Sequence, residues 1–353
     1  MQYSEGYLLD NRYRLERFIG SGSFGEVWVA NDNQTDLEVA VKIYVAMDEK
    51  GLEDFKKEFQ LSFEFNHTNL LHANYLGVNA EDRRPYLVMP FCPEGSVSRY
   101  AGDMPEDELW HFIHDVAAGL AYLHAQEPPI IHQDIKPDNI LILKNGDYVI
   151  TDFGISKQLR QSLRKSAISL NSAGAISYMG PERFSKNFQA VKASDIWSLG
   201  AAIYELAAGD VPFCGMGGSL QKQGADMPEM PPQYSSQMRI VCLSCLAREP
   251  WDRPTAAQLR DYATKVINGA KDAPIPWKYD IPELAVKEEP KIEEPEETVE
   301  IAGVAAENID APAKSGFVRT EAAAERKSVS VWISILAVVL GLVTGAMIEL
   351  FLV

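Results

Sequence analysis

Apolar runs of strand length fill the beginning of the chain, and helical patterns follow them. Strand-like runs lie at 12–19, 26–32, 39–42 and 86–89. Within 51–65, phenylalanine recurs every fourth residue, which predicts a helix with one inward face. The pattern therefore predicts a strand-rich first unit that includes a helix.

A second unit begins after a connector at 90–95. Pro105 precedes three acidic residues, a favourable first helical turn, and apolar residues then recur at helical spacing. A polar stretch with Pro137 follows between apolar runs at 130–131 and 140–143. We interpret these two runs as strands that anchor a loop at both ends.

Composition narrows the class of protein. The chain has 353 residues, 46% hydrophobic and 24% charged, and is large enough to bury a core. Its net charge of −17 excludes the basic face that nucleic acid binding requires, so we expect no nucleic acid partner. Its four cysteines are too few for a disulfide framework and indicate a reducing compartment. Cys242 and Cys245, spaced as neighbours on a helix, are interpreted as packing thiols.

A glycine pattern and a lysine carry the first chemical signal. Gly20, Gly22 and Gly25 form a GxGxxG pattern, but a strand-like run follows it, whereas a dinucleotide site requires a helix. A hairpin whose backbone amides close over phosphate groups fits better. Lys42 ends the next apolar run, and a lysine on a buried strand requires an anionic partner. We expect phosphate oxygens and the carboxylate of Glu58 to provide it.

Oxygen-bearing side chains carry the second signal. Asp134 and Asn139 lie in the polar loop of the second unit. Asp152 follows the strand 148–150, which a tight turn at 144–147 brings back toward that loop. Two carboxylates and one amide therefore come together. Such ligands suit Mg²⁺, and a further carboxylate can orient a hydroxyl group.

Taken together, these motifs resemble the eukaryotic-type (Hanks-type) serine/threonine protein kinase family in its bacterial-like form. The resemblance covers residues 10–266 and implies an α+β, bilobal fold, with a small β-rich lobe at 10–89 and a helical lobe at 91–266. It implies ATP and Mg²⁺ as cofactors and proteins with Ser or Thr acceptors as substrates. The alternative is a pseudokinase that acts as a membrane-tethered binding or scaffold module.

The resemblance also implies roles for individual residues. Asp134 is expected to be the catalytic base, and Lys136 to contact the γ-phosphate. Asn139 and Asp152 are the expected Mg²⁺ ligands. The expected nucleotide-binding residues are Ile19, Gly20, Gly22, Gly25, Val27, Ala40, Lys42, Glu58 and Met89.

The resemblance also implies two internal braces, and the chain departs from the family pattern at three positions, of which Gly180 in place of the usual alanine is minor. Arg253 is expected to pair with Glu182, and Asp195 to brace the catalytic loop. Gln133 replaces the arginine that usually precedes the catalytic aspartate and receives an activation-loop phosphate, so we expect no need for that phosphate in the usual way. Ala175 replaces a usual threonine and could slow transfer or loosen substrate choice.

The C-terminal part differs in kind. Residues 267–327 are rich in Pro and Glu, and 281–300 hold eight Glu against two Lys, which predicts an extended, disordered linker. The 21 residues of 328–348 carry no charge. As a helix they span about 31 Å, the thickness of a bilayer core. We therefore expect a transmembrane helix at 328–350; the alternative is a buried core helix.

Flanking residues orient this helix. Arg326 and Lys327 precede it, so we expect a single-pass membrane protein whose kinase domain is cytoplasmic. Ala337, Gly341 and Gly345 lie on one helix face, a pattern that favours a homodimer, although small residues are common in such helices.

The segment between Asp152 and Glu182 is basic and contains no acid. We hypothesise that the acidic linker or anionic lipid holds this segment and couples activity to the membrane. The alternative is that both segments are simply solvated.

Overall fold

The computed structural model describes residues 3–22, 25–63, 65–152, 176–186, 188, 190–270 and 272–278, without the side chains of 57, 58, 61 and 62. They belong to one compact unit, Met1–Val286, and the second unit, Lys287–Val353, lies outside the described residues. The predictions that lie outside them concern Ala175, the basic segment after Asp152, the linker 267–327 beyond residue 278, the membrane helix 328–350 and its Ala337, Gly341 and Gly345. The described start of the predicted linker is not extended throughout, because Trp277 is buried in the core of the helical lobe. Within the described part, no helix is long and apolar enough to cross a membrane.

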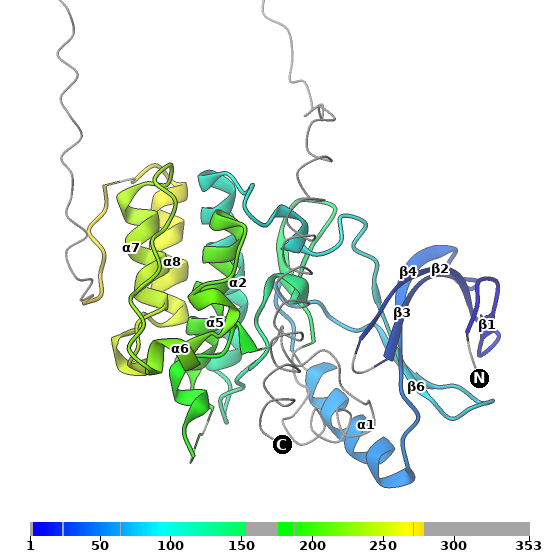
Figure 1. Cartoon of the computed structure of the whole chain (residues 1–353). Coiled ribbons are helices and arrows are strands. Elements are labelled where there is room, and N and C mark those ends of the chain that lie inside the picture. The colour runs from blue at the N-terminus through cyan, green and yellow to red at the C-terminus, as the bar shows by residue number, and fades with distance from the viewer. Residues whose placement is uncertain are drawn as a thin grey trace, which may run out of the picture. The chain divides into compact units, whose positions relative to one another are not determined.

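An antiparallel sheet forms the N-terminal lobe (Figure 1). The strand order is β1-β2-β3-β4-β6-β5. The strands are β1 Leu8–Leu9, β2 Tyr13–Gly22, β3 Gly25–Asp32, β4 Leu37–Tyr44, β5 Tyr75–Val78 and β6 Pro85–Pro90. The glycine pattern thus lies at the β2–β3 hairpin, as its flanking runs predict.

Side chains alternate between the two faces of this sheet, and that alternation positions the site. In β4, Val39, Val41 and Ile43 pack in one apolar cluster. Ala40 and Tyr44 pack in another, on the opposite face. Lys42 shares the parity of the second set, so the strand directs it to that face.

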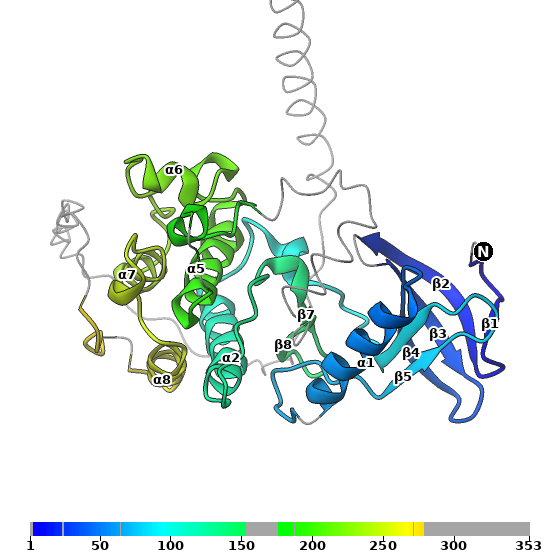
Figure 2. The same ribbon diagram turned by 90° about the horizontal axis from the view of Figure 1, so that it is seen from below.

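Helix α1, Glu49–Phe63, covers the same face (Figure 2). Phe55 and Phe59 are buried there, and Phe55 packs edge-on against Tyr44 at 4.7 Å between ring centroids. The predicted helix is confirmed, although it begins and ends two residues earlier than the pattern indicates. Asp48 explains the earlier start, because its carboxylate accepts a hydrogen bond from Gly51 N at 2.7 Å.

The C-terminal lobe is helical. Its helices are α2 Glu106–His124, α5 Lys192–Ala208, α6 Gly218–Lys222, α7 Ser236–Cys245 and α8 Ala256–Ile267, with short 3₁₀ segments η1 Val97–Tyr100, η2 Pro137–Asn139, η3 Pro181–Phe184, η4 Phe213–Gly215 and η5 Pro250–Asp252. Helix α2 packs against α5 and α8, and α5 packs against α7. Cys242 and Cys245 are fully buried in α7, which confirms their structural interpretation.

Strands β7 Ile140–Ile142 and β8 Tyr148–Ile150 form a small two-stranded sheet. Ile140 and Ile150 pack in the helical core, and Val149 packs in the cluster that contains Phe55 and Phe59. The predicted turn joins β7 and β8, because Gly146 N donates to Leu143 O. The prediction of a strand at 130–131 is wrong. Ile130 N instead donates to the carbonyl of Leu123 at the end of α2, so that segment is tied to a helix terminus and not to a neighbouring strand.

Candidate active site

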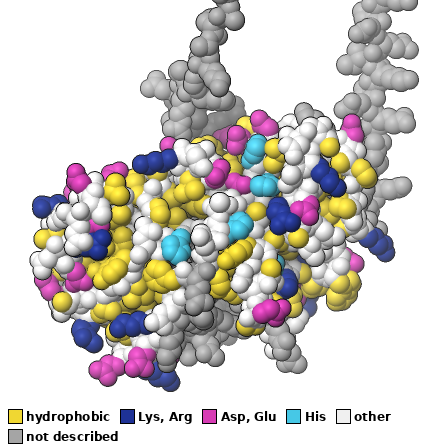
Figure 3. Space-filling model, turned by 180° about the vertical axis from the view of Figure 1, so that it is seen from behind, with side chains coloured by type: hydrophobic (Ala, Val, Ile, Leu, Met, Phe, Trp, Pro, Cys, Tyr) yellow, Lys and Arg dark blue, Asp and Glu magenta, His cyan; other side chains and the backbone are white. Residues whose placement is uncertain are grey.

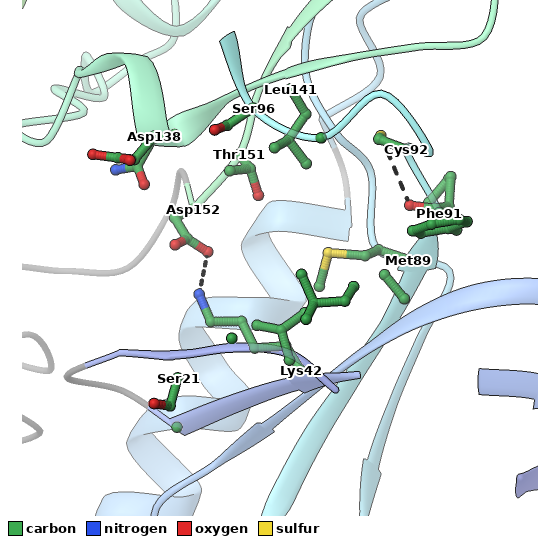
Figure 4. Close-up of a pocket in the computed structure, with 18 of the residues that line it drawn as sticks. Ser21, Lys42, Met89, Phe91, Cys92, Ser96, Asp138, Leu141, Thr151 and Asp152 are labelled. Carbon is green, nitrogen blue, oxygen red and sulfur yellow. Dashed lines mark hydrogen bonds and ion pairs between the residues drawn. The ribbon is translucent and has the colours of Figure 1, made fainter. Parts of the chain in front are cut away.

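A cavity of about 600 Å³ opens between the β4 face that carries Lys42 and the loop before β7 (Figure 4). Of the residues predicted from the sequence, those that line it are Ile19, Gly20, Gly25, Val27, Ala40, Lys42, Met89, Asp134, Lys136, Asn139 and Asp152. Sheet register explains part of this set, because Val27 lies opposite Lys42 and Ala40 lies opposite Met89. The fold therefore gathers side chains from distant segments around one space.

Lys42 and Asp152 face each other across this cavity. Lys42 Nζ lies 2.5 Å from Asp152 Oδ1, and the two side chains are 11% and 20% exposed. Figure 4 shows the lysine reaching from the sheet toward the carboxylate. The side chain of Glu58, the partner expected from the sequence, lies outside the described residues. The observed contact joins the two lobes through a cation and a carboxylate.

Asp152 is held in an unusual backbone conformation. Its φ of +63° lies in the left-handed region, which costs a non-glycine residue about 1–2 kcal/mol. The preceding residue is fixed on both sides, since Thr151 N donates to Asn139 O at 2.9 Å and His132 Nε2 contacts Thr151 O at 3.0 Å. These bonds tie the aspartate to the loop that carries Asp134.

The loop itself is organised around Asp134. Asn139 Nδ2 donates to the backbone oxygen of Asp134 at 2.7 Å and to its Oδ2 at 3.0 Å. Lys136 Nζ lies 3.9 Å from the same carboxylate. Asp134 N donates to His132 Nδ1, and His132 therefore carries its proton on Nε2, which faces the Thr151 carbonyl. The histidine is a structural brace.

Asp195 anchors this loop from α5 and is fully buried. Its carboxylate accepts the backbone N–H of His132 at 2.8 Å and that of Gln133 at 2.7 Å. The ring of His124 contributes a third contact at 2.9 Å. The expected bracing role of Asp195 is confirmed, and the part played by His124 was not predicted.

Arg253 and Glu182 form the second expected brace. Arg253 Nη1 and Nη2 lie 3.1 and 2.9 Å from the two oxygens of Glu182. Burial alone would raise the pKa of Glu182, but the hydrogen bonds and charge of Arg253 outweigh burial and keep that pKa below its ordinary value. The predicted pair is confirmed.

Comparisons with known proteins agree with this geometry. The protein kinase domain family matches residues 13–263. The chain belongs to the protein kinase family. The serine/threonine-protein kinase PrkC of Bacillus subtilis (strain 168) is 30% identical over 265 residues, which are 72% of this chain and 40% of PrkC. The serine/threonine-protein kinase PknA of Mycobacterium tuberculosis (strain ATCC 25618 / H37Rv) is 31% identical over 258 residues, 69% of this chain and 58% of PknA.

A eukaryotic relative gives a similar match. The serine/threonine-protein kinase dst1 of Dictyostelium discoideum is 31% identical over 258 residues, 71% of this chain and 34% of dst1. The chain spans about half the length of the curated relatives it matches. The shared part is thus the kinase fold with its β-sheet lobe and its helical lobe.

The donor set of the kinase cavity suits a hard divalent cation. Asn139 uses its NH₂ group on Asp134, which leaves the amide oxygen as its ligand atom. Asp152 adds a carboxylate close to Lys42. Amide and carboxylate oxygens are ligands that Mg²⁺ accepts, and Lys42 adds a positive charge for phosphate oxygens.

Several residues of the kinase cavity were missed by sequence reasoning. They are Arg17, Ser21, Pro90, Phe91, Cys92, Pro93, Gly95, Ser96, Asp138, Leu141 and Thr151. Leu141 had a signal, because its neighbours Ile140 and Ile142 belong to the helical core and strand alternation turns the middle residue the other way. Cys92 had none, since it lies in an irregular connector. Burial raises the pKa of its thiol.

Other titratable clusters of the kinase domain are structural. A hollow of about 500 Å³ is lined in part by Glu108, His111, His114 and Asp115. Glu108 and Asp115 accept hydrogen bonds from the hydroxyl and the backbone N–H of Tyr148. Figure 3 shows histidines dispersed among acidic and hydrophobic side chains on one face. Among the described residues, no three or more His, Cys, Asp or Glu side chains come together in a way that could hold a metal ion.

Proposed function

We propose that the chain is an ATP-dependent serine/threonine protein kinase that transfers the γ-phosphoryl group to hydroxyl groups of protein substrates. The observation that carries the proposal is the meeting of Lys42, Asp134, Asn139 and Asp152 at one cavity. Phosphoryl transfer depends on positioning and charge neutralisation, and these residue types supply both. The names of the bacterial relatives support the Ser/Thr class.

Each of these side chains has a definite task in the proposed reaction. Lys42 binds phosphate oxygens of the nucleotide, and Lys136 balances negative charge beside Asp134. Asp134 accepts the proton of the acceptor hydroxyl, and the hydrogen bond from Asn139 fixes the orientation of its carboxylate. Asn139 and Asp152 would hold Mg²⁺, which when bound neutralises charge on the phosphates.

The wall of the cavity provides the remaining part of a nucleotide site. Ile19, Val27, Ala40 and Met89 present apolar surface suited to a flat base. Gly25 begins β3 at the turn of the β2–β3 hairpin, and Gly20 lies in β2 opposite Val27. A Cβ at Gly25 would lie 1.9 Å from Ile43 O. Only glycine fits there, so the hairpin lies close against β4 near the phosphate end. Gly22 belongs to the same hairpin.

The direct test is phosphate incorporation from γ-labelled ATP with Mg²⁺ by the full chain, beside Asp134→Asn and Asp152→Asn. We expect label on the wild type and loss of about 1,000-fold or more in both variants, since they remove the base and a metal ligand. Nucleotide binding is measured in parallel. An unlabelled wild type that still binds ATP would contradict the proposal and favour the pseudokinase module.

We also infer that the kinase is anchored in a membrane by residues 328–350, with its kinase domain in the cytoplasm. The uncharged run of 328–348 and the basic pair Arg326–Lys327 support this. The full chain should resist carbonate extraction from membranes, whereas a chain ending at residue 327 should be released. Equal extraction of the full chain and of the chain that ends at residue 327 would contradict the anchor.

The homodimer contact has its own test. Gly341→Leu should crosslink less than the wild type in membranes, because a larger side chain separates the two helices. Equal crosslinking would contradict the contact.

A further inference from the structure

Gln133, the residue before the catalytic aspartate, is held from both of its peptide groups. Its N–H donates to the buried carboxylate of Asp195 at 2.7 Å. Its carbonyl accepts from Arg183 Nη1 at 2.8 Å. Its φ of +65° lies in the left-handed region, where a residue with a Cβ is strained. Such a backbone persists only where its surroundings stabilise it, and Arg183 provides one of these two hydrogen bonds.

Arg183 is itself fixed in place. It follows Glu182, whose carboxylate is bound by the fully buried side chain of Arg253. Its guanidinium also lies over the ring of Phe188, at 5.4 Å from the ring centroid. The segment η3 therefore presents the arginine to the catalytic loop from a rigid base.

The carbonyl that Arg183 binds belongs to the peptide bond that joins Gln133 to Asp134. Movement of this peptide would rotate the backbone of Asp134 and displace its carboxylate. The hydrogen bond is charge-assisted, and such bonds are the strong ones. Since Gln133 stands where kinases of this family usually carry arginine, the positive charge near this point comes from a different segment of the chain.

We propose that Arg183 is a positioning residue for phosphoryl transfer, which holds the Gln133–Asp134 peptide so that the catalytic carboxylate faces the acceptor hydroxyl. The inference rests on the proposed kinase function. It adds that the contact is built into the C-terminal lobe through Glu182 and Arg253, and so does not depend on a phosphate on the chain.

A matched pair of variants tests this role. Arg183→Met keeps the aliphatic stem and removes the donor. Lys222→Met is the control, because Lys222 Nζ also donates to a carbonyl of the same region, Phe184 O at 3.2 Å, and does not contact the catalytic loop in any described bond. Arg183→Lys keeps the charge and a donor.

The readouts are kcat, the KM for ATP, and hydrogen exchange of the backbone across 131–139, all on the full chain with dephosphorylated casein as acceptor. We expect Arg183→Met to lower kcat about 10- to 100-fold, as a displaced catalytic group does, with the KM for ATP changed less than about twofold. Exchange at 131–139 should rise. Arg183→Lys should recover part of kcat, and Lys222→Met should match the wild type.

The opposite results are equally definite. An unchanged kcat in Arg183→Met, or an equal loss in Lys222→Met, would overturn the positioning role, as would a rise in KM for ATP with kcat unchanged. An inactive wild type would instead contradict the proposed function. Hydrogen exchange separates the two failures, because it reports whether Arg183 holds the loop even in a chain that transfers no phosphate.

Discussion

The ammonium group of Lys42 lies 2.5 Å from the carboxylate of Asp152, although 110 positions separate the two residues. One belongs to β4 of the sheet and the other follows β8. Their pairing brings a cation from one lobe to an oxygen ligand from the other. A site that binds a phosphate group together with a metal ion needs both a cation and an oxygen ligand.

Lys42→Met should reduce kcat/KM for ATP by about 100-fold or more, because a preorganised charge at the phosphates is lost. Steady-state kinetics with varied ATP measure it. Lys144→Met, at an exposed lysine in the turn between β7 and β8, is the control and should match the wild type. Similar kcat/KM values for all three proteins would show that Lys42 does not contact the nucleotide.

Glu182→Gln should lower the free energy of unfolding by about 3–5 kcal/mol, because it leaves the buried guanidinium of Arg253 without its counter-charge. Urea denaturation measures the change. Asp261→Asn breaks the exposed pair with Arg260 and should cost less than about 1 kcal/mol. Equal losses for the two variants would show that burial of the Glu182 pair has no energetic consequence.

Asp32 should make the N-terminal lobe sensitive to acid. Its carboxylate accepts two hydrogen bonds from Arg12. These bonds are the main reason why the pKa of Asp32 is lowered from 3.8 to about 2, and hydrogen bonds from Gln34 N and Thr35 contribute to the same shift. Because the folded pKa is depressed, the stabilisation is present above pH 4 and is lost as pH falls from about 4 toward 2.

Asp32→Asn should therefore cost about 1 kcal/mol near neutral pH and little at pH 2, as expected for a well-aligned but partly exposed pair. Thermal unfolding from pH 7 down to the lowest pH at which the domain folds measures the difference. Glu38→Gln, at an exposed position in β4, serves as control. A deficit that stays constant with pH would contradict the ionic origin of the effect.

The four cysteines should react with iodoacetamide in an order set by burial. Cys214 is exposed and should be alkylated first. Cys242 and Cys245 are fully buried, and burial raises the pKa of Cys245 to about 12, so both stay protonated and inert at pH 8. Cys92 should react slowly and be protected by nucleotide, because it lines the cavity. Mass spectrometry of the labelled peptides measures the order, and rapid labelling of Cys242 would contradict it.

Local pattern predicted a good share of the elements. The glycine hairpin, the helix that carries Phe55 and Phe59, and the strand that ends near Lys42 all follow from period and residue type. The run at 130–131 shows the limit of such reasoning. Two apolar residues are too few to distinguish a strand from an extended segment, and only the bond to Leu123 decides between them.

The sequence alone was therefore enough to predict the chemical groups of the site and their order: a glycine hairpin suited to phosphate, a lysine on a buried strand, and a loop with Asp134 and Asn139. Tertiary structure decided which groups hold them. His124 contacts Asp195 across 71 positions and Arg183 reaches Gln133 across 50, and no local periodicity encodes either contact. Periodicity reports the face on which a side chain lies, whereas the partner that it meets there depends on how separate elements pack.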